Sequence, residues 1–277
     1  MTSHQSRRAS GFALPLVLWL IVILMTMVGV LAYSAKVGHI ESRAQFDRVE
    51  AEAAAQAGIT YAVARMTPQL DAEAWGPSFE SRNLQLDDWS ITLTIRDESG
   101  KFDLNHGPLE LLAALMQAKQ VPASQAALVT AKLTEQRRDA AGFVNPIPAV
   151  PGAPPAAGPT GRKIASISEL RQWQGIEPAT IDLLADELTV HSSTARPEWR
   201  LASPSMRKAL ADTGQAGVDT RPASGAELGS GTYAIESIAQ RSGRPPGRVF
   251  VVLRAFPRGG GGMASTWLAW EHGRWTQ

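Results

Sequence analysis

The chain has 277 residues with 27 basic and 26 acidic side chains, so its formal net charge at pH 7 is +1. A charge this close to zero argues against a nucleic-acid-binding protein that works through bulk positive charge. The sequence contains no cysteine, which excludes disulfides, thiolate metal sites and a cysteine nucleophile.

The first organised segment is an apolar run without charged residues from Phe12 to Ala35. As a helix rising about 1.5 Å per residue, it is about 36 Å long and can cross a hydrocarbon core of ~30 Å. We therefore expect a transmembrane helix. A secretory signal peptide is the competing interpretation, although its apolar region normally spans only about 7–15 residues.

This run follows a basic leader that ends in Arg-Arg-Ala-Ser-Gly at Gly11. Cleavage after Gly11 would place Pro15 in a first helical turn, where proline is tolerated. A polar leader ending in glycine, an aromatic next residue and an apolar helix resemble the signal of type IV pilins and type II secretion pseudopilins. The resemblance implies that prepilin peptidase cuts the Gly11–Phe12 bond and methylates the amine of Phe12.

Leu16 is the informative departure from the pilin pattern, because most pilins carry glutamate at this fifth mature position. In the family, that glutamate is thought to neutralise the amine of the preceding subunit inside the apolar fibre. A buried unpaired charge is costly, so a subunit without the glutamate should have no subunit ahead of it. Its absence is typical of protein K, the minor pseudopilin that caps the type II secretion pseudopilus. An ordinary membrane anchor is the alternative explanation.

Residues 36–67 are predicted to continue as an amphipathic stem helix, because apolar residues recur there at three- and four-residue steps until Pro68. The alanine-rich stretch from Arg43 to Gly58 also resembles the stem of protein K.

A head domain is predicted beyond the stem, beginning with strict alternation of apolar and polar residues from Trp89 to Arg96, which indicates a half-buried strand. A turn and a short strand follow in the block DESGKFDLN, residues 97–105, which resembles the same region of protein K. We expect Asp97 and Asp103 to end strands and cap turns. Members of the family have been seen with calcium, which carboxylate oxygens suit, but no EF-hand spacing is present and no ligand is assigned.

Helical periodicity returns at 108–119 and 123–139, and a loop rich in proline, glycine and alanine is expected at 142–161. Residues 167–188 predict two short helices joined by Gly-Ile-Glu-Pro. Helix-hairpin-helix modules bind DNA phosphates through such a turn, but the acidic Glu177 and the amide-free Pro178 argue against that use here.

Three further strands are expected at 232–239, 248–256 and 265–270, forming an antiparallel meander that joins the strand at 89–96. Trp267 and Trp270 are interpreted as core and rim aromatics. Residues 205–231 carry no clear signal and are expected to form a long loop.

No catalytic motif is present: Gly-x-Ser-x-Gly and phosphate-loop patterns are missing, and the five histidines show no metal-ligand spacing. We therefore predict that the protein is not an enzyme.

These features predict an α+β fold in which a long N-terminal transmembrane and stem helix packs on an antiparallel pilin-like sheet, with an inserted all-helical domain resembling SAM and helix-hairpin-helix modules. The expected division is a leader (1–11), a transmembrane helix (12–35), a stem (36–67), a head in two parts (68–105 and 205–277) and the insertion (106–204).

The resemblance to the protein K family implies a minor pseudopilin that caps the type II secretion pseudopilus and helps to initiate its assembly for protein export across the outer membrane. The implied partners are the minor pseudopilins called proteins I and J, the major pseudopilin and prepilin peptidase, with no nucleic acid. The implied location is the inner membrane, with a single span and a periplasmic head, and calcium is the only cofactor that the resemblance suggests. A minor pilin of a type IV pilus, acting in assembly or adhesion, is the alternative.

Overall fold

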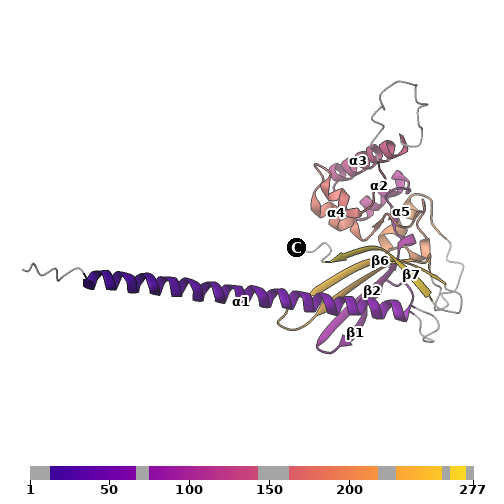
Figure 1. The fold of residues 1–277 in the computed structure, drawn as a ribbon. Coiled ribbons are helices and arrows are strands. Elements are labelled where there is room, and N and C mark those ends of the chain that lie inside the picture. The colour runs from indigo at the N-terminus through magenta and orange to yellow at the C-terminus, as the bar shows by residue number, and fades with distance from the viewer. Residues whose placement is uncertain (1–12, 67–74, 143–161, 218–228, 258–262, 273–277) are drawn as a thin grey trace, which may run out of the picture. The chain divides into compact units, whose positions relative to one another are not determined.

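The computed structural model describes residues 13–66, 75–142, 162–217, 229–257 and 263–272 (Figure 1). Its contacts divide the chain into two units, Met1–Glu50 and Ala51–Gln277. The leader, the cleavage residues Gly11 and Phe12, and nearly all of the predicted proline-rich loop lie outside the described residues.

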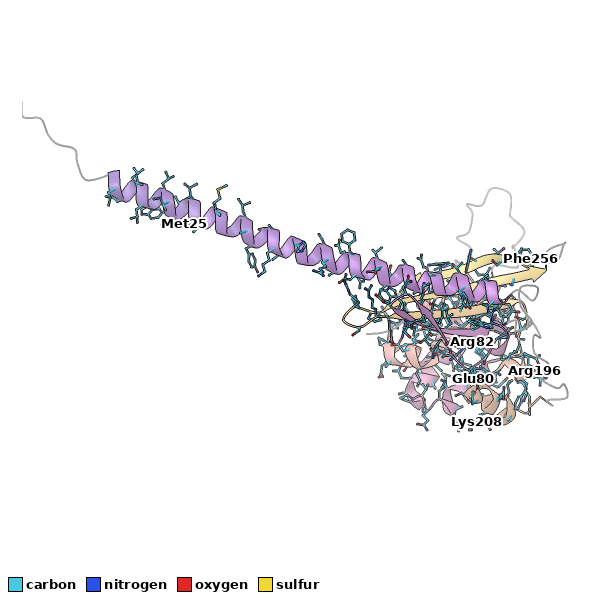
Figure 2. All side chains as sticks on the ribbon, turned by 90° about the horizontal axis from the view of Figure 1, so that it is seen from below. Met25, Glu80, Arg82, Arg196, Lys208 and Phe256 are labelled. Atoms are coloured by element: carbon cyan, nitrogen blue, oxygen red, sulfur yellow. The ribbon has the colours of Figure 1, made fainter. Side chains whose placement is uncertain are left out.

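Helix α1, Ala13–Arg65, is a single helix of 53 residues that contains both the predicted membrane segment and the predicted stem. Among the described helices it is the one that is long and apolar enough to cross a membrane. Its apolar side chains project outward, as Met25 does in Figure 2. Pro15 lies in its first turn, where the missing amide costs no helical hydrogen bond.

The second unit is built around a five-stranded antiparallel sheet with the strand order β1-β2-β5-β6-β7. Its strands are β1 (Arg82–Leu86), β2 (Trp89–Asp97), β5 (Thr232–Gln240), β6 (Gly247–Pro257) and β7 (Met263–His272). The predicted meander and its pairing with the strand at 89–96 are therefore confirmed. Strand β1, which was not expected, pairs with β2 through a tight hairpin in which Asp87 has a φ of 49°.

The C-terminal end of α1 packs on one face of this sheet and forms the sheet core. The helix presents small residues to the strands there: Ala51, Ala54, Ala55, Gly58 and Ala62. A Cβ added at Gly58 would lie 2.5 Å from Ser237 Oγ and 2.7 Å from Ile91 Cγ2. The alanine-rich composition of this stretch thus lets the helix approach the sheet closely, which a larger side chain would prevent.

The remaining elements enclose a second hydrophobic core, the helical core. They are α2 (Leu109–Ala118), α3 (Ala123–Gly142), η2 (Ile167–Gln172), α4 (Pro178–Ala185), η3 (Trp199–Leu201) and α5 (Pro204–Asp212). The predicted helices at 108–119 and 123–139 are confirmed as α2 and α3. The predicted helical pair at 167–188 is also confirmed, although its first member, η2, is a 3-10 helix.

Helix α5 corrects the expectation of a long loop over residues 205–231. Ser203 accepts a hydrogen bond from Met206 N at 3.0 Å, and Pro204 occupies the first helical turn. Met206, Ala209 and Leu210 are fully buried in the helical core. The serine cap, the proline and this apolar spacing form a helix-start signal that was overlooked because the helix is short.

The block DESGKFDLN connects the sheet to the helical core. It continues from β2 through the 3-10 turn η1 (Glu98–Gly100) into the short strand β3 (Phe102–Asp103). The predicted short strand is present, but its partner is β4 (Leu188–Thr189), with which it pairs in parallel, and not the large sheet. The chain therefore passes from the sheet core, which contains Ile95, to the helical core, which contains Phe102, within a few residues.

Candidate functional site

The predicted assembly residues are only partly described. Leu16 follows Pro15 in the first turn of α1, with its side chain exposed, and that turn contains no acidic residue. Gly11 and Phe12 lie outside the described residues. The cleavage site and the role of Leu16 therefore remain predictions.

The described head has its densest polar arrangement in the block DESGKFDLN, where every residue from Asp97 to Leu104 is buried. Four of these side chains are ionisable: Asp97, Glu98, Lys101 and Asp103. Burying a charged group costs free energy unless it is paired or hydrogen-bonded, so the partners of these four groups determine what the segment does.

Asp97 joins the end of β2 to the start of β5. Its Oδ1 atom accepts hydrogen bonds from Ser99 N at 2.8 Å and Ser99 Oγ at 2.6 Å. Ser230, just before β5, donates its backbone N–H to Oδ2 and its hydroxyl to Oδ1, both at 2.7 Å. The carboxylate thus caps η1 and fixes the entry of β5, and both of its oxygens are used. Burial and, to a smaller extent, the negative charge of Asp97 raise the pKa of Tyr233 to about 12.

Glu98 joins the same turn to the helical core. One of its carboxylate oxygens pairs with Lys101 Nζ, and the other accepts a hydrogen bond from the hydroxyl of Thr189 in β4. Glu187, just before β4, is held by Ser203 Oγ at 2.6 Å and by Lys119 Nζ at 3.2 Å. Both buried glutamates are therefore satisfied by groups from other segments.

Asp103 closes the second turn of the block. Its Oδ1 atom accepts from the backbone amides of Asn105 and His106 at 2.8 and 3.0 Å. Its Oδ2 atom accepts from Ser192 Oγ at 3.0 Å and Ser193 N at 2.9 Å. The interpretation of Asp97 and Asp103 as turn-capping residues is therefore confirmed, and both also bind segments far away in the sequence.

Two further side chains hold the end of the block in place. Asn105 exchanges two hydrogen bonds of 2.9 Å with the backbone of Ile164. The guanidinium of Arg137, from α3, donates to the carbonyl oxygens of Leu104 at 2.9 Å and Gly107 at 2.6 Å. The turn residues of the block predicted local capping by Asp97 and Asp103, but no sequence signal identified these distant partners.

The residues do not fit a calcium site. Among the described residues, no three histidine or acidic side chains cluster closely enough to hold a metal ion. The oxygens of Asp97 and Asp103 already accept hydrogen bonds from N–H and O–H groups, which a cation would have to displace. We therefore assign no metal ligand in the described part of the chain.

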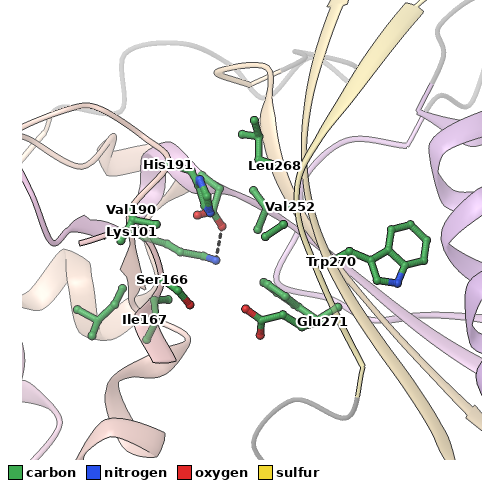
Figure 3. A pocket seen from close by; sticks show the side chains of 14 residues that line it. Lys101, Ser166, Ile167, Val190, His191, Val252, Leu268, Trp270 and Glu271 are labelled. Atoms are coloured by element: carbon green, nitrogen blue, oxygen red, sulfur yellow. Dashed lines mark hydrogen bonds and ion pairs between the residues drawn. The ribbon is translucent and has the colours of Figure 1, made fainter. Parts of the chain in front are cut away.

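A cavity of about 280 Å³ lies beside this block, between the helical core and the sheet face opposite α1. Figure 3 shows Lys101 and His191 on one side of it and Val252 and Leu268 on the other. Burial lowers the pKa of His191 from its usual 6.5, against the opposing charge of Glu98 and with a smaller contribution from Lys101 in the same direction as burial. The charge of Lys101 is balanced by Glu98.

The polar groups of this cavity have structural partners. Ser166, which also lines it, caps η2 by accepting a hydrogen bond from Ser168 N at 3.2 Å. The described lining thus combines an ion pair, an imidazole, a capping serine and the carboxylate of Glu271 with apolar walls. This set is suited to receiving a side chain or a small molecule, and it contains no nucleophile hydrogen-bonded to a base.

Trp267 and Trp270 were expected to be core and rim aromatics, and the core part of this expectation is wrong because both side chains are partly exposed at the rim of the sheet. They are 46% and 40% exposed, and their ring centroids lie 5.1 Å apart in an edge-to-face arrangement. In β7, Trp267 pairs with Leu253 and Trp270 with Val251, so Leu268 is an extra residue in a β-bulge. The bulge brings both indoles onto the same face of the sheet, which simple alternation does not predict.

Comparison with known proteins finds similarity at the level of structure. No protein-family model matches the chain, and no curated protein matches its sequence. A solved structure, the crystal structure of the GspK-GspI-GspJ complex from the type 2 secretion system of enterotoxigenic Escherichia coli, contains a chain to which this one is similar. The two are 17% identical with a TM-score of 0.49, and the match covers 87% of this chain and 99% of that chain.

We predict that Asp97→Ala destabilises the head by about 2–4 kcal/mol, because the amides of Ser99 and Ser230 lose their buried acceptor. Urea unfolding of the full chain in detergent, followed by circular dichroism, measures this change. The matched control is Asp88→Ala, which removes an exposed partner of Arg241 and should cost less than about 1 kcal/mol. Equal effects of the two substitutions would contradict the role assigned to Asp97.

Proposed function

We propose that this chain is a minor pseudopilin of the type II secretion system, of the protein K type, that caps the pseudopilus tip and helps to initiate its assembly for export across the outer membrane. In this role it is an assembly component with no catalytic chemistry of its own. Its proposed location is the inner membrane, with one span and a periplasmic head.

The observation that carries the proposal is helix α1, which combines two properties in one uninterrupted element. Its N-terminal part has the length and composition of a membrane span, and its C-terminal end, from Ala51 on, forms the core of an antiparallel sheet. In a subunit of this kind, one helix both anchors the chain in the membrane and packs against the sheet of the folded head. The polar leader that ends at Gly11 supports the pilin class in particular.

The tip position is supported by Leu16 and by the helical elements between β3 and β5. A leucine at this position offers no carboxylate to the amine of a preceding subunit, so a fibre position with no such subunit suits it. The helical elements add bulk to the sheet, and bulk is best accommodated at the end of a packed fibre. In this proposal the partners are the minor pseudopilins I and J and the major pseudopilin, while prepilin peptidase processes the chain.

The pilin class is tested by the N-terminus of the membrane-extracted protein, determined by mass spectrometry from cells with and without prepilin peptidase. We expect a chain that begins at methylated Phe12, and we expect this species to disappear when the peptidase is missing. An intact Met1 in both cells would leave a plain membrane anchor, and a start after Ser34 would make the protein a secreted one; either result rejects the proposal.

The tip position is tested by the substitution Leu16→Glu. Because the new carboxylate would be buried without an amine to pair with, we expect it to reduce secretion severalfold or to move the subunit from the tip into the fibre. Immunogold labelling of the pseudopilus and a secretion assay measure the two effects. The control is Leu14→Glu, which introduces the same charge two positions earlier and cannot restore the pilin pattern. Unchanged secretion and tip labelling in Leu16→Glu would contradict the proposed role.

A further inference from the structure

One wall of the cavity beside residues 97–105 carries a buried ammonium group with unused donors. The side chain of Lys101 is 7% exposed, and in Figure 3 its Nζ atom points into the cavity. An ammonium has three N–H donors, and among the described residues its one hydrogen-bond acceptor is the carboxylate of Glu98. The ring of Phe250 lies 6.0 Å from Nζ. Because buried polar groups are almost always hydrogen-bonded, the remaining donors require an acceptor that occupies the cavity.

Two further polar groups reach the same space from different elements. The backbone N–H of His191 donates to Thr189 Oγ1 at 2.9 Å, and within the described residues neither ring nitrogen has a hydrogen-bond partner. In its neutral form this imidazole offers one donor and one acceptor. The carboxylate of Glu271, in β7, enters from the opposite wall, as Figure 3 shows, and each of its oxygens can accept more than one hydrogen bond. The lining therefore offers both donors and acceptors to an occupant.

The cavity also presents charges of both signs, which works against a charged occupant. An anion placed at Lys101 would lie close to the carboxylate of Glu98, and a cation placed at Glu271 would share the cavity with the ammonium. A hydroxyl group suits both ends, since it can accept from an ammonium and donate to a carboxylate. The polar groups thus favour a neutral occupant with several hydroxyl groups.

The size and the apolar walls of the cavity define the body of this occupant. At ~30 Å³ for each molecule, a volume of about 280 Å³ corresponds to about nine waters. Apolar side chains line much of it, two from the helical side and two from the sheet: Ile167, Val190, Val252 and Leu268. Waters alone would leave these walls hydrated, and an alkyl chain would leave the ammonium without an acceptor. A six-membered sugar ring meets both requirements, because its C–H groups are apolar and its hydroxyl groups lie at its edges.

We propose that this cavity binds one neutral sugar ring, whose hydroxyl groups accept from Lys101 and donate to Glu271 and His191. The C–H groups of the ring would lie against Val190 and Leu268. The site goes beyond the proposed function and does not depend on it.

The proposal is tested by isothermal titration of the full chain with glucose, galactose, mannose and N-acetylglucosamine. The chain is held in lipid nanodiscs, because glycoside detergents would themselves present sugar rings to the cavity. We expect at least one of the four sugars to bind with a Kd of about 1 mM or tighter, as suits a ligand of this size. Failure of all four to bind at concentrations in the tens of millimolar would overturn the proposal and leave the cavity to water.

Charged sugars of the same ring size test the argument from the lining. Glucuronate adds a carboxylate to the hexose ring, and glucosamine, at a pH at which its amine is protonated, adds an ammonium. We expect each to bind at least about tenfold more weakly than the best neutral sugar, because each places a like charge beside one of the charged groups of the cavity. Equal affinity for the neutral and the charged rings would contradict the proposal.

Two alanine variants of β7 test the location of the sugar without changing a polar group. Ala269 lines the cavity and is partly exposed, so Ala269→Leu should fill part of the space and weaken binding at least about tenfold. Ala264 is also partly exposed but does not line the cavity, and Ala264→Leu should leave the Kd unchanged. Thermal unfolding shows whether both variants remain folded. Unchanged binding to a folded Ala269→Leu protein would place the sugar elsewhere and reject the proposed site.

Discussion

The structure of the head depends on three buried carboxylates that lie within seven residues of one another, Asp97, Glu98 and Asp103. A buried carboxylate is tolerated only when its oxygens are fully used, and each of these obtains at least one partner from a distant part of the chain. Asp97 binds Ser230 before β5, Glu98 binds Thr189 in β4, and Asp103 binds the turn at Ser192 and Ser193. Loss of one contact would leave a buried polar group without one of its partners, and because the three carboxylates lie in one short segment we infer that the contacts form and break together.

This arrangement explains how a sheet core and a helical core can behave as one head. The two cores share no hydrophobic residue. The block between them is bound to the sheet through Asp97 and Ser230 and to the helical elements through Glu98 and Thr189. The two faces of the sheet differ in what covers them. One is closed by the small residues of α1, and the other retains the cavity that β6 and β7 share with the helical elements.

Local patterns in the sequence predicted much of this fold. Alternation identified β2, because burial there follows the period of the strand backbone, and runs separated by turn residues identified β5, β6 and β7. The apolar run and the three- and four-residue spacing identified α1, helical periodicity identified α2 and α3, and the turn Gly-Ile-Glu-Pro marked the start of α4. The capping roles of Asp97 and Asp103 were also predictable from turn chemistry. Strand β1 was missed because only Leu84 and Leu86 mark it as apolar, and α5 was missed because it is short. No core tryptophan is found at 267 or 270, because a bulge changes the alternation and places both indoles on one face of the outer strand. Partners such as Ser230, Ile164 and Arg137 depend on tertiary structure that no local pattern encodes.

The central claim is that residues 97–105 make the two cores unfold as one unit, and native-state hydrogen exchange of the full chain in nanodiscs tests it directly. The account predicts that amides of the sheet core, such as those of Ile235 and Val251, and of the helical core, such as those of Leu112 and Leu115, open with the same free energy and the same dependence on denaturant. The amides of Phe102 and Leu104 should follow both sets. Opening of the helical core at a clearly lower free energy, with the sheet still protected, would contradict the claim.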